Sequence, residues 1–479
     1  MKEYILEGLQ PRSVFRFFEE LSRIPRGSGD NQAASDWCVR FAQERGLRWR
    51  QDEALNVIIW KDASPGYEDH PAVILQGHLD MVCVQDKGVD HDFTKDSLEL
   101  YVDGDFVKAR GTTLGGDNGI AVAMALAVLD DDAIAHPPIE AVFTTDEEIG
   151  LLGAVALDCS DLQGRMLLNL DSEEEGILTV SCAGGARCDI TRTYPTASCS
   201  GTVCTLTVSG LQGGHSGIEI NMGRANANKV LAECLAKMPA SLRLVSVFGG
   251  LQDNAIPKEA SASFLLDSAD LSGIGTDDLQ KEFAARFAAA EPGLSIALEI
   301  GGEGSREVLS SDDSAAFIRL LNDYPNGVQA MSNDIDGLVQ TSLNLGVLRL
   351  ENGSCQLSSA IRSSVSAEKT ALSQRLAALA AAYGADFGQR GDYPAWEYRK
   401  DSPLRETMVQ VYREQYGKEP VIEAIHAGLE CGIFSDKLPG LDAVSIGPDL
   451  AEVHSTRERL SISSTERFWQ YLLGILARL

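Results

Sequence analysis

Apolar positions from about Val73 onward fall in short consecutive runs separated by polar loops. The runs AVILQ, IAVAMALAVL, PIEAVFTT and MLLNLD predict, in this order, a strand, a helix and two strands. Because the apolar residues are consecutive rather than alternating, we expect strands that are covered on both faces, as in an α/β layer. Reactive side chains should then lie where loops leave the strand ends.

The pattern changes near Ala186, where strands begin to alternate apolar and polar residues. A first βαββαβ unit is predicted from a strand over 202–209, a helix over 225–238, strands over 242–248 and 261–266, a helix over 276–290 and a strand over 294–300. A second pass has a helix over 312–323, strands over 341–350 and 355–365, a helix over 367–383 and an extended piece to about Trp396. We expect two related α+β halves, although no residue-level repeat is visible.

The α/β pattern returns after Ser402, with helices predicted over 404–416 and 463–478 and the strand-like VIEAIHAG and VSIGP between them. The predicted fold class is therefore α/β, with a discontinuous domain on a mixed sheet and an inserted α+β domain. The discontinuous domain comprises residues 1–186 and 396–479, and the insertion comprises residues 187–395.

Composition narrows the possible partners. The chain has 479 residues, enough for two or three domains, and its 41 Lys and Arg against 70 Asp and Glu give a formal net charge of −29. Self-repulsion opposes binding to nucleic-acid phosphates or to an anionic membrane, and no compact basic patch is visible. The most apolar stretch, 120–129, is about half as long as a membrane span. We expect neither nucleic acid nor a membrane as a partner.

Cysteine spacing and the first residues bear on localisation. The ten cysteines include no C-x-x-C pair and are scattered through apolar contexts, unlike a disulfide framework or a zinc ribbon. The first 25 residues contain no unbroken apolar run followed by a small-residue cleavage site. We therefore expect buried thiols and a cytoplasmic protein.

Five loop clusters place a histidine or a carboxylate just past an apolar run or a glycine turn. They are QGHLDMV (76–82), GGDNG (115–119), TTDEEIG (144–150), NLDSEEEG (169–176) and EVHST (452–456). Taken singly, each fits a structural role such as a core histidine, a helix cap or a solvated turn. Together they supply the ligand types that a pair of divalent ions takes up, and imidazole suits zinc. The predicted ligands are His78, Asp117, Glu148, Asp171 and His454.

One carboxylate should bridge the two metals. If Asp117 is the bridge, each ion has one histidine, one terminal carboxylate and the shared aspartate, and the net charge of +1 favours a bound hydroxide as nucleophile. Asp80 follows His78 by two residues on an extended segment, so it should accept the imidazole N–H and orient the ring. Neighbouring side chains that leave a strand point apart, so we assign Glu148 to a metal and Glu147 as the general base.

These motifs resemble the M20 family of zinc-dependent aminoacylases, carboxypeptidases and dipeptidases. GGDNG, TDEEIG, LDSEEEG, SCAGG (181–185), HAGLECG (426–432) and the doubled insertion resemble its cytosolic aminoacyl-histidine dipeptidase branch, and the similarity runs from about Phe15 to the C-terminus. The resemblance implies a two-metal catalytic domain with the insertion as a lid. It also implies a metal-dependent dipeptidase that acts on small peptides of the Xaa-His and β-Ala-His type, with zinc as the expected ion and cobalt or manganese as alternatives.

The resemblance also assigns residues of the insertion. His215 in GLQGGHSG would stabilise the oxyanion, and Arg362 in AIRSS would hold the substrate carboxylate, although a loop histidine and a solvated strand arginine are the alternative interpretations. Asn254 in DNAIP and the loop from Gly428 to Glu430 resemble substrate-contacting positions. His426 is expected to be a positioned loop residue, with a role as an additional metal ligand or in substrate binding as the alternative. A doubled lid can imitate a dimer within one chain or form the surface of a homodimer, so whether His215 serves its own or a partner's site stays open.

Other functions remain in competition at this stage. The same metal set serves tripeptide cleavage or removal of an N-acyl group from an amino acid, although the acids of SEEEG (172–176) favour a substrate with a free amine. A non-catalytic peptide-binding protein should have lost a ligand or Glu147, and none is lost. A two-metal phosphoesterase would call for Lys or Arg in the five clusters, which contain none.

Overall fold

The chain forms two compact units in the computed structural model, which describes residues 4–272 and 274–479. Unit 1 is the described part of Met1–Ser181 together with Tyr398–Ala424 and Leu429–Leu479. Unit 2 is the described part of Cys182–Glu397 together with Ile425–Gly428. Unit 2 thus begins at 182 and ends at 397, where the sequence suggested 187 and 395, and it also takes in a short segment that the sequence placed in the other domain.

Unit 1 is built on an eight-stranded mixed sheet with the strand order β1-β2-β6-β3-β7-β21-β8-β20. In that order the strands are Arg48–Gln51, Val57–Lys61, Ile139–Thr144, Val73–His78, Met166–Asn169, Asp442–Ser445, Ile177–Cys182 and Val421–Ile425. The neighbours β6, β3, β7 and β21 run parallel. Strands β3, β6 and β21 are buried at every residue, as their consecutive apolar runs predict.

The register of the four parallel strands brings their carboxyl ends to one level. His78 ends β3 and is paired with Thr144, which ends β6. Gln76 of β3 is paired with Asn169, which ends β7, and Asn169 is also paired with Ser445, which ends β21. Ligand sites in such sheets lie beyond the carboxyl ends of the strands, and the loops that follow here carry four of the five polar clusters.

Helices cover this sheet. They are α1 (Arg12–Ser22), α2 (Gln32–Arg45), α3 (Gly116–Asp130), α4 (Leu152–Ala156), α9 (Pro403–Tyr416), α10 (Glu430–Lys437) and α11 (Ile462–Leu476). Helix α3 lies between β3 and α1, so its residues 118–129 are all buried, which explains the unbroken apolar run. Helix α2 contacts β1 and β2, and α9 and α10 contact β21.

A small four-stranded sheet brings two distant segments of unit 1 together. Its order is β22 (Leu450–Ala451), β23 (Arg459–Ser461), β5 (Phe106–Ala109) and β4 (Leu100–Asp103). The β22–β23 hairpin carries the His454 loop between its strands, and β23 pairs with β5, which precedes the Asp117 segment. The fifth polar cluster, GGDNG, therefore lies on the chain that leaves this small sheet and enters α3.

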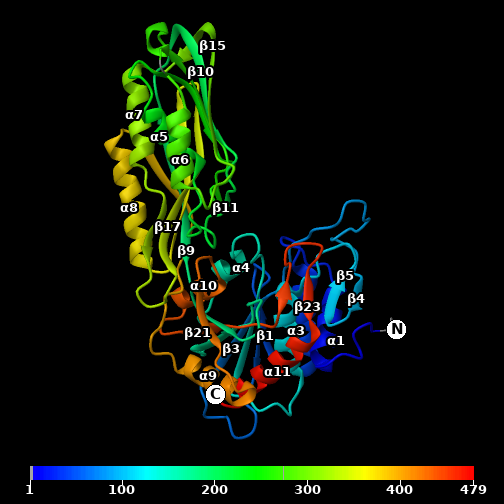
Figure 1. Ribbon diagram of the computed structural model, residues 1–479. Helices are drawn as coiled ribbons and strands as arrows, with labels where there is room; N and C mark the ends of the chain where they lie inside the picture. The colour runs from blue at the N-terminus through cyan, green and yellow to red at the C-terminus, as the bar shows by residue number, and fades with distance from the viewer. Residues whose placement is uncertain (1–3, 273) are drawn as a thin grey trace. The chain divides into compact units, whose positions relative to one another are not determined.

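Unit 2 has a nine-stranded sheet with the order β15-β10-β14-β12-β17-β18-β9-β19, and β16 (Gly327–Met331) is an additional neighbour of β17. The first half is β10 (Ala197–Ser209), α5 (Ala227–Ala236), β12 (Arg243–Gly249), β14 (Ala260–Leu266), α6 (Asp277–Arg286) and β15 (Ser295–Val308). The second half is β9 (Gly184–Thr193), α7 (Ser311–Asp323), β17 (Val339–Glu351), β18 (Ser354–Ser363), α8 (Ser366–Ala382) and β19 (Asp386–Tyr393). Figure 1 shows the four helices along one side of this sheet.

The two halves have the same strand order, and they join where β12 pairs antiparallel with β17. The first strand of the second half is β9, which precedes the whole first half in the sequence. The first half is therefore inserted within the second. The periodicity of residues 312–396 predicted the later elements of the second half but not this strand, because β9 is distant in sequence from the strands and helices it joins.

Two further expectations concern the chain as a whole. Eight of the ten cysteines are buried, as predicted. None of the helices in the described ranges is long and apolar enough to cross a membrane. A homodimer through the insertion stays a prediction.

Candidate metal centre

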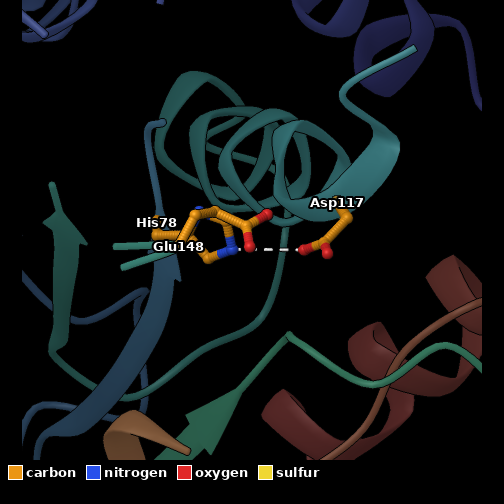
Figure 2. Close-up of side chains that lie close together, drawn as sticks. All are labelled: His78, Asp117 and Glu148. Carbon is orange, nitrogen blue, oxygen red and sulfur yellow. Dashed lines mark hydrogen bonds and ion pairs between the residues drawn. The ribbon is translucent and has the colours of Figure 1, made fainter. Parts of the chain in front are cut away.

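Asp117 lies between the two histidines of the predicted ligand set. Its Oδ1 is 3.1 Å from Nε2 of His78, and its Oδ2 is 3.1 Å from Nε2 of His454. Figure 2 shows Asp117, at the start of α3, facing the imidazole of His78 at the end of β3. Because each carboxylate oxygen faces a different imidazole, Asp117 has the arrangement of a ligand that bridges two ions.

Each histidine has a second carboxylate of its own. Oδ1 of Asp171 is 3.6 Å from Nε2 of His78, and Oε1 of Glu148 is 3.0 Å from Nε2 of His454. Ligand atoms of His78, Asp117 and Glu148 all lie within 4.8 Å of one another. The structure thus brings all five predicted ligands together in two groups that share Asp117.

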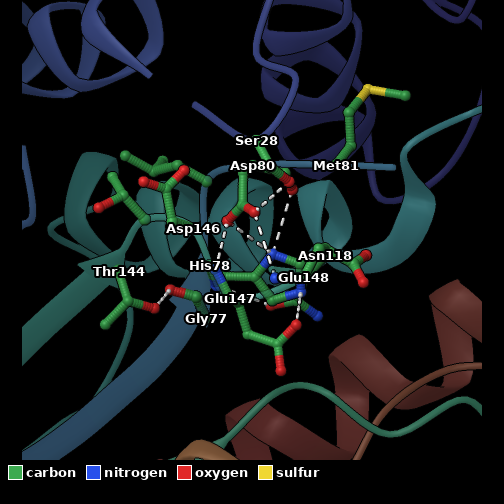
Figure 3. Close-up of polar contacts among 12 residues, drawn as sticks. Ser28, Gly77, His78, Asp80, Met81, Asn118, Thr144, Asp146, Glu147 and Glu148 are labelled. Carbon is green, nitrogen blue, oxygen red and sulfur yellow. Dashed lines mark hydrogen bonds and ion pairs between the residues drawn. The ribbon is translucent and has the colours of Figure 1, made fainter. Parts of the chain in front are cut away.

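Asp80 ties His78 to the loop that carries the two glutamates (Figure 3). Its Oδ1 is 3.4 Å from Nδ1 of His78 and accepts the backbone N–H of Glu147 at 3.1 Å, while its Oδ2 accepts the N–H of Glu148 at 3.3 Å. The hydroxyl of Ser28 donates to the same Oδ2 at 2.8 Å. The spacing in the sequence predicted the imidazole contact, whereas the other three contacts come from segments distant in sequence.

Asp146 fixes the turn before Glu147. Its backbone is left-handed, with φ of 52°, a conformation that aspartate adopts more readily than most residues. Its Oδ1 accepts hydrogen bonds from the N–H of Gly29 at 2.7 Å and from Nδ2 of Asn31 at 2.6 Å. The N-terminal segment around residues 28–31 therefore supports the glutamate loop, a role that sequence reasoning missed.

Glu147 lies beside His78, with its Oε2 4.0 Å from Nε2 of the imidazole. Burial and the nearby carboxylates raise the pKa of Glu147 to about 8, although His78 acts in the opposite direction. Divalent ions bound beside Glu147 would lower this pKa and favour the carboxylate, which is the form that the general base predicted at this position requires.

The electrostatics of the cluster fit divalent cations. Burial alone would lower the pKa of His78, but Asp171, Asp117, Asp80 and Glu147 raise it well above its usual value. Burial raises the pKa of Asp171, and hydrogen bonds to Asp117 and Glu148 raise that of His454 to about 10. Carboxylates crowded in this way repel one another and compete for positive charge, which two divalent ions would supply.

Glu430 is a further buried acid of this region, at the end of the loop from Gly428 to Glu430 that resembles a substrate-contacting segment. It begins α10 and is fully buried, and its Oε2 accepts hydrogen bonds from Nε2 of Gln76 at 2.5 Å and from Oγ1 of Thr144 at 2.8 Å. Burial raises its pKa to about 7. The sequence thus pointed to this loop through the motif HAGLECG but did not predict that its acid is buried, because an acid is also common at a helix start.

The insertion residues lie in unit 2, where His215, Arg362 and His426 form what we call the unit-2 cluster. Burial lowers the pKa of His215, and burial lowers that of His426 to about 3, with Arg362 contributing to both shifts. Both histidines therefore stay uncharged next to the guanidinium near neutral pH. Nε2 of His426 is 2.7 Å from the hydroxyl of Ser342.

The unit-2 cluster has polar atoms that are left without partners. Nη1 of Arg362 donates to the hydroxyl of Tyr393 at 3.1 Å, but its buried Nε and Nδ1 of His426 have no hydrogen-bond partner among the described residues. Buried polar groups usually find a partner, so this cluster is suited to a polar ligand. Tyr393 was not predicted as a member of the site.

The remaining two predicted positions adjoin this cluster. His215 in β11 (Gly214–His215) pairs with Ala255 in β13 (Ala255–Ile256), and the carbonyl of Asn254 accepts the N–H of Ser216 at 2.9 Å. A Cβ at Gly428 would lie 2.9 Å from Cε2 of Tyr393, so glycine is required for the close approach of this ring.

Comparison with known proteins identifies the class. A profile of peptidase family M20/M25/M40 matches residues 74–478. The chain therefore belongs to this peptidase family.

Individual relatives resemble the chain over nearly its full length. It is 38% identical over 480 residues to the cytosol non-specific dipeptidase of Escherichia coli (strain K12), covering 98% of each chain. The crystal structure of aminoacylhistidine dipeptidase from Vibrio alginolyticus matches with a TM-score of 0.93 and 37% identity over 98% of this chain and 97% of that one. Aminopeptidase PepT from Bacillus cereus matches with a TM-score of 0.56 and 15% identity over 98% and 99% of the two chains, which shows a shared fold alone.

These matches confirm several predictions made from the motifs. The family, the resemblance to the aminoacyl-histidine dipeptidase branch, the α/β fold class and an enzyme of the metallo-dipeptidase class are all confirmed. The assignment of individual residues and the choice of peptide are not tested by the comparisons and are taken up as proposals.

The predicted bridging role of Asp117 implies that its removal affects both ions, whereas removal of one histidine should affect one. We expect the metal-depleted protein to bind two equivalents of Zn²⁺ in isothermal titration calorimetry, Asp117→Ala to lose high affinity for both, and His454→Ala to lose it for one. His70→Ala, an exposed histidine of the same unit, serves as the control and should bind two equivalents. Loss of the same single equivalent in both ligand variants would show that Asp117 is not a bridge.

Proposed function

We propose that this protein is a metal-dependent dipeptidase whose substrates include Xaa-His dipeptides such as β-alanyl-histidine. The observation that carries the proposal is Asp117 placed 3.1 Å from each of two imidazoles, with Glu147 4.0 Å from one of them, that of His78. Membership of a peptidase family and full-length similarity to two proteins named as dipeptidases support it. The name of the Escherichia coli relative also supports a cytoplasmic location.

Two divalent ions would be held by two sets of side chains that share one member. His78, Asp171 and Asp117 would hold one ion, and His454, Glu148 and Asp117 the other, with zinc as the expected metal because imidazole and carboxylate ligands suit it. Bound there, the ions would supply Lewis-acid chemistry that polarises a water molecule and the scissile carbonyl group.

Glu147 would move the proton. A water molecule hydrogen-bonded to Oε2 of Glu147 loses a proton to this oxygen as its own oxygen forms a bond to the carbonyl carbon. The carboxyl group then gives the proton to the leaving nitrogen as the C–N bond breaks. The products are two amino acids, and Glu147 returns to the carboxylate form.

The unit-2 cluster would recognise the substrate. Arg362 presents a guanidinium whose buried Nε has no partner in the described chain, and a substrate carboxylate would supply one in a charge-assisted bond. His215, kept neutral by burial and by Arg362, can donate an N–H to the oxyanion without adding charge to the cluster. Asn254 and Gly428, which adjoin this cluster, would contact the peptide.

The substrate class can be tested by incubating metal-depleted protein, restored with Zn²⁺ or Mn²⁺, with a panel of peptides. The panel contains Xaa-His dipeptides, other dipeptides, a tripeptide and N-acetyl amino acids, and products are detected by mass spectrometry. We expect metal-dependent cleavage of dipeptides, Xaa-His among them. Turnover confined to the tripeptide or the acetylated substrates would contradict a dipeptidase, and no turnover with two metals bound would indicate a binding protein.

Replacement of the proposed base should slow the reaction without emptying the site. We expect Glu147→Gln to lower kcat by about 10²-fold to 10⁴-fold, because a positioned proton acceptor contributes on this order. Metal content, measured by elemental analysis, should remain at two equivalents. Glu44→Gln, an exposed acid of helix α2 in the same unit, is the control and should keep the wild-type kcat. A kcat for Glu147→Gln within a few-fold of wild type would refute the assignment.

The role of Arg362 can be isolated with a substrate that lacks its proposed partner. We expect Arg362→Lys to raise the KM for a dipeptide about tenfold or more, because lysine keeps the charge but loses the planar fork. The KM for the corresponding dipeptide amide should change little. Arg349→Lys provides the control, since Arg349 is a strand arginine of the same unit that donates to the carbonyls of Gly249 and Gly250. Equal losses for both substrates would argue against carboxylate recognition.

A further inference from the structure

Two buried side chains of opposite charge hold the loop that carries Asp117. Arg26 is 1% exposed and Glu458 is 3% exposed, and neither belongs to the ligand set. Burying a charge is costly unless hydrogen bonds satisfy it, so the partners of these two groups indicate what they do. All of the partners lie on backbone segments that lead to proposed ligands.

The carboxylate of Glu458 accepts hydrogen bonds from the backbone at the start of α3. Its Oε2 accepts the N–H groups of Leu114 at 2.7 Å and Gly115 at 3.0 Å, and its Oε1 accepts those of Gly116 at 2.8 Å and Asp117 at 3.3 Å. Four consecutive amides therefore point at one carboxylate, which also complements the positive end of the helix dipole.

Glu458 also belongs to the segment that carries His454. It follows His454 by four residues. Its own N–H donates to the carbonyl of Ser455 at 3.1 Å, which closes a turn from Ser455, the residue after His454, to Glu458. One side chain thus connects the His454 loop to the Asp117 loop by four hydrogen bonds.

Arg26 connects the Asp117 loop to the His78 segment. Its Nη1 donates to the carbonyls of Leu79 at 2.9 Å and Asp80 at 3.2 Å, and its Nη2 donates to the carbonyl of Gly115 at 2.5 Å. A Cβ at Gly119 would lie 2.7 Å from the same Nη2. The glycines of GGDNG therefore leave the space that the guanidinium occupies.

Gly115 is held from both sides. Its N–H is bonded to Glu458 and its carbonyl to Arg26, two residues before Asp117. The two side chains fix the loop against both of the segments that carry the histidines. Since Asp117 must stand at bonding distance from two ions at once, a displacement of this loop would spoil both sets of contacts.

We propose that Glu458 is a positioning residue which, with Arg26, sets the place of Asp117 between His78 and His454 and thereby the affinity for the metal pair. The inference rests on the proposed metal centre. Glu458 acts by fixing the position of the loop and not by its charge. A variant that keeps the charge but cannot reach the four amides should therefore lose metal affinity as a neutral variant does.

A matched control exists in the same unit. Glu140 is 2% exposed and accepts the N–H groups of Gln163 at 2.9 Å and Gly164 at 2.9 Å and Nε1 of Trp60 at 3.2 Å. It is a buried carboxylate bonded to backbone amides, as Glu458 is, but its bonds lead to no proposed ligand. Glu140→Gln should lower thermal stability while leaving metal binding unchanged.

The test measures Zn²⁺ affinity of the metal-depleted full chain by competition with a chelator, together with the visible absorption spectrum of the Co²⁺ form. We expect Glu458→Gln and Glu458→Asp each to weaken binding about tenfold to 100-fold, the range typical of residues that orient metal ligands, and to alter the Co²⁺ bands. Glu140→Gln should keep wild-type affinity and spectrum. Arg26→Lys keeps the positive charge but loses the planar guanidinium that bonds the carbonyls of two segments. It should weaken Zn²⁺ binding as the Glu458 variants do.

Three results would overturn the inference. Wild-type affinity in both Glu458 variants would remove its basis, and wild-type affinity in Glu458→Asp alone would assign the effect to charge rather than to placement. If the Glu458 variants do not fold, as judged by circular dichroism, wild-type affinity in Arg26→Lys would refute the inference. Failure of the unmodified protein to bind two ions would instead disprove the metal centre, and the inference with it.

Discussion

Repulsion among carboxylates is the constraint on which the candidate metal centre depends. Asp117 lies 3.1 Å from both imidazoles, Glu148 lies 3.0 Å from that of His454, and Asp171 lies 3.6 Å from that of His78. Glu147 is 4.0 Å from the imidazole of His78. Burial strengthens this repulsion because it removes the screening by water. The pKa values of Glu147 and Asp171 are raised first by burial itself and then by the neighbouring carboxylates, against the opposing effect of His78. A chain can keep such an arrangement only if its backbone is held by other means and if cations complete the charge balance.

The backbone supports are buried hydrogen bonds rather than apolar contacts alone. Asp80 binds the amides of Glu147 and Glu148, and Glu458 binds four amides at the start of α3. Each support is itself an acid, so the negative charge near the centre grows with every support. Arg26 is a buried cation whose positive charge offsets part of this negative charge. Its hydrogen bonds to the backbone carbonyls of the same loops hold the guanidinium in place.

The sequence predicted the parts of the site that follow from local pattern. Apolar runs placed β3, β6 and β7, and the polar residues just after them supplied His78, Glu148 and Asp171, because a parallel sheet gathers its carboxyl ends. Arg26, Asp146 and Glu458 were missed since each acts on segments that are distant in sequence, which no local spacing reveals. Strand β9 was missed for the same reason, because the strands it joins in the sheet are separated from it by an inserted half.

The two units carry clusters of opposite charge: carboxylates around the two ligand histidines in unit 1, and Arg362 with neutral histidines in unit 2. In unit 1, carboxylates outnumber the two ligand histidines and are suited to cations. In unit 2, the cluster is built around one guanidinium, and the neighbouring histidines stay neutral because burial and Arg362 lower the pKa of each. A second positive charge there would repel Arg362, whereas neutral imidazoles add hydrogen-bonding capacity at no electrostatic cost.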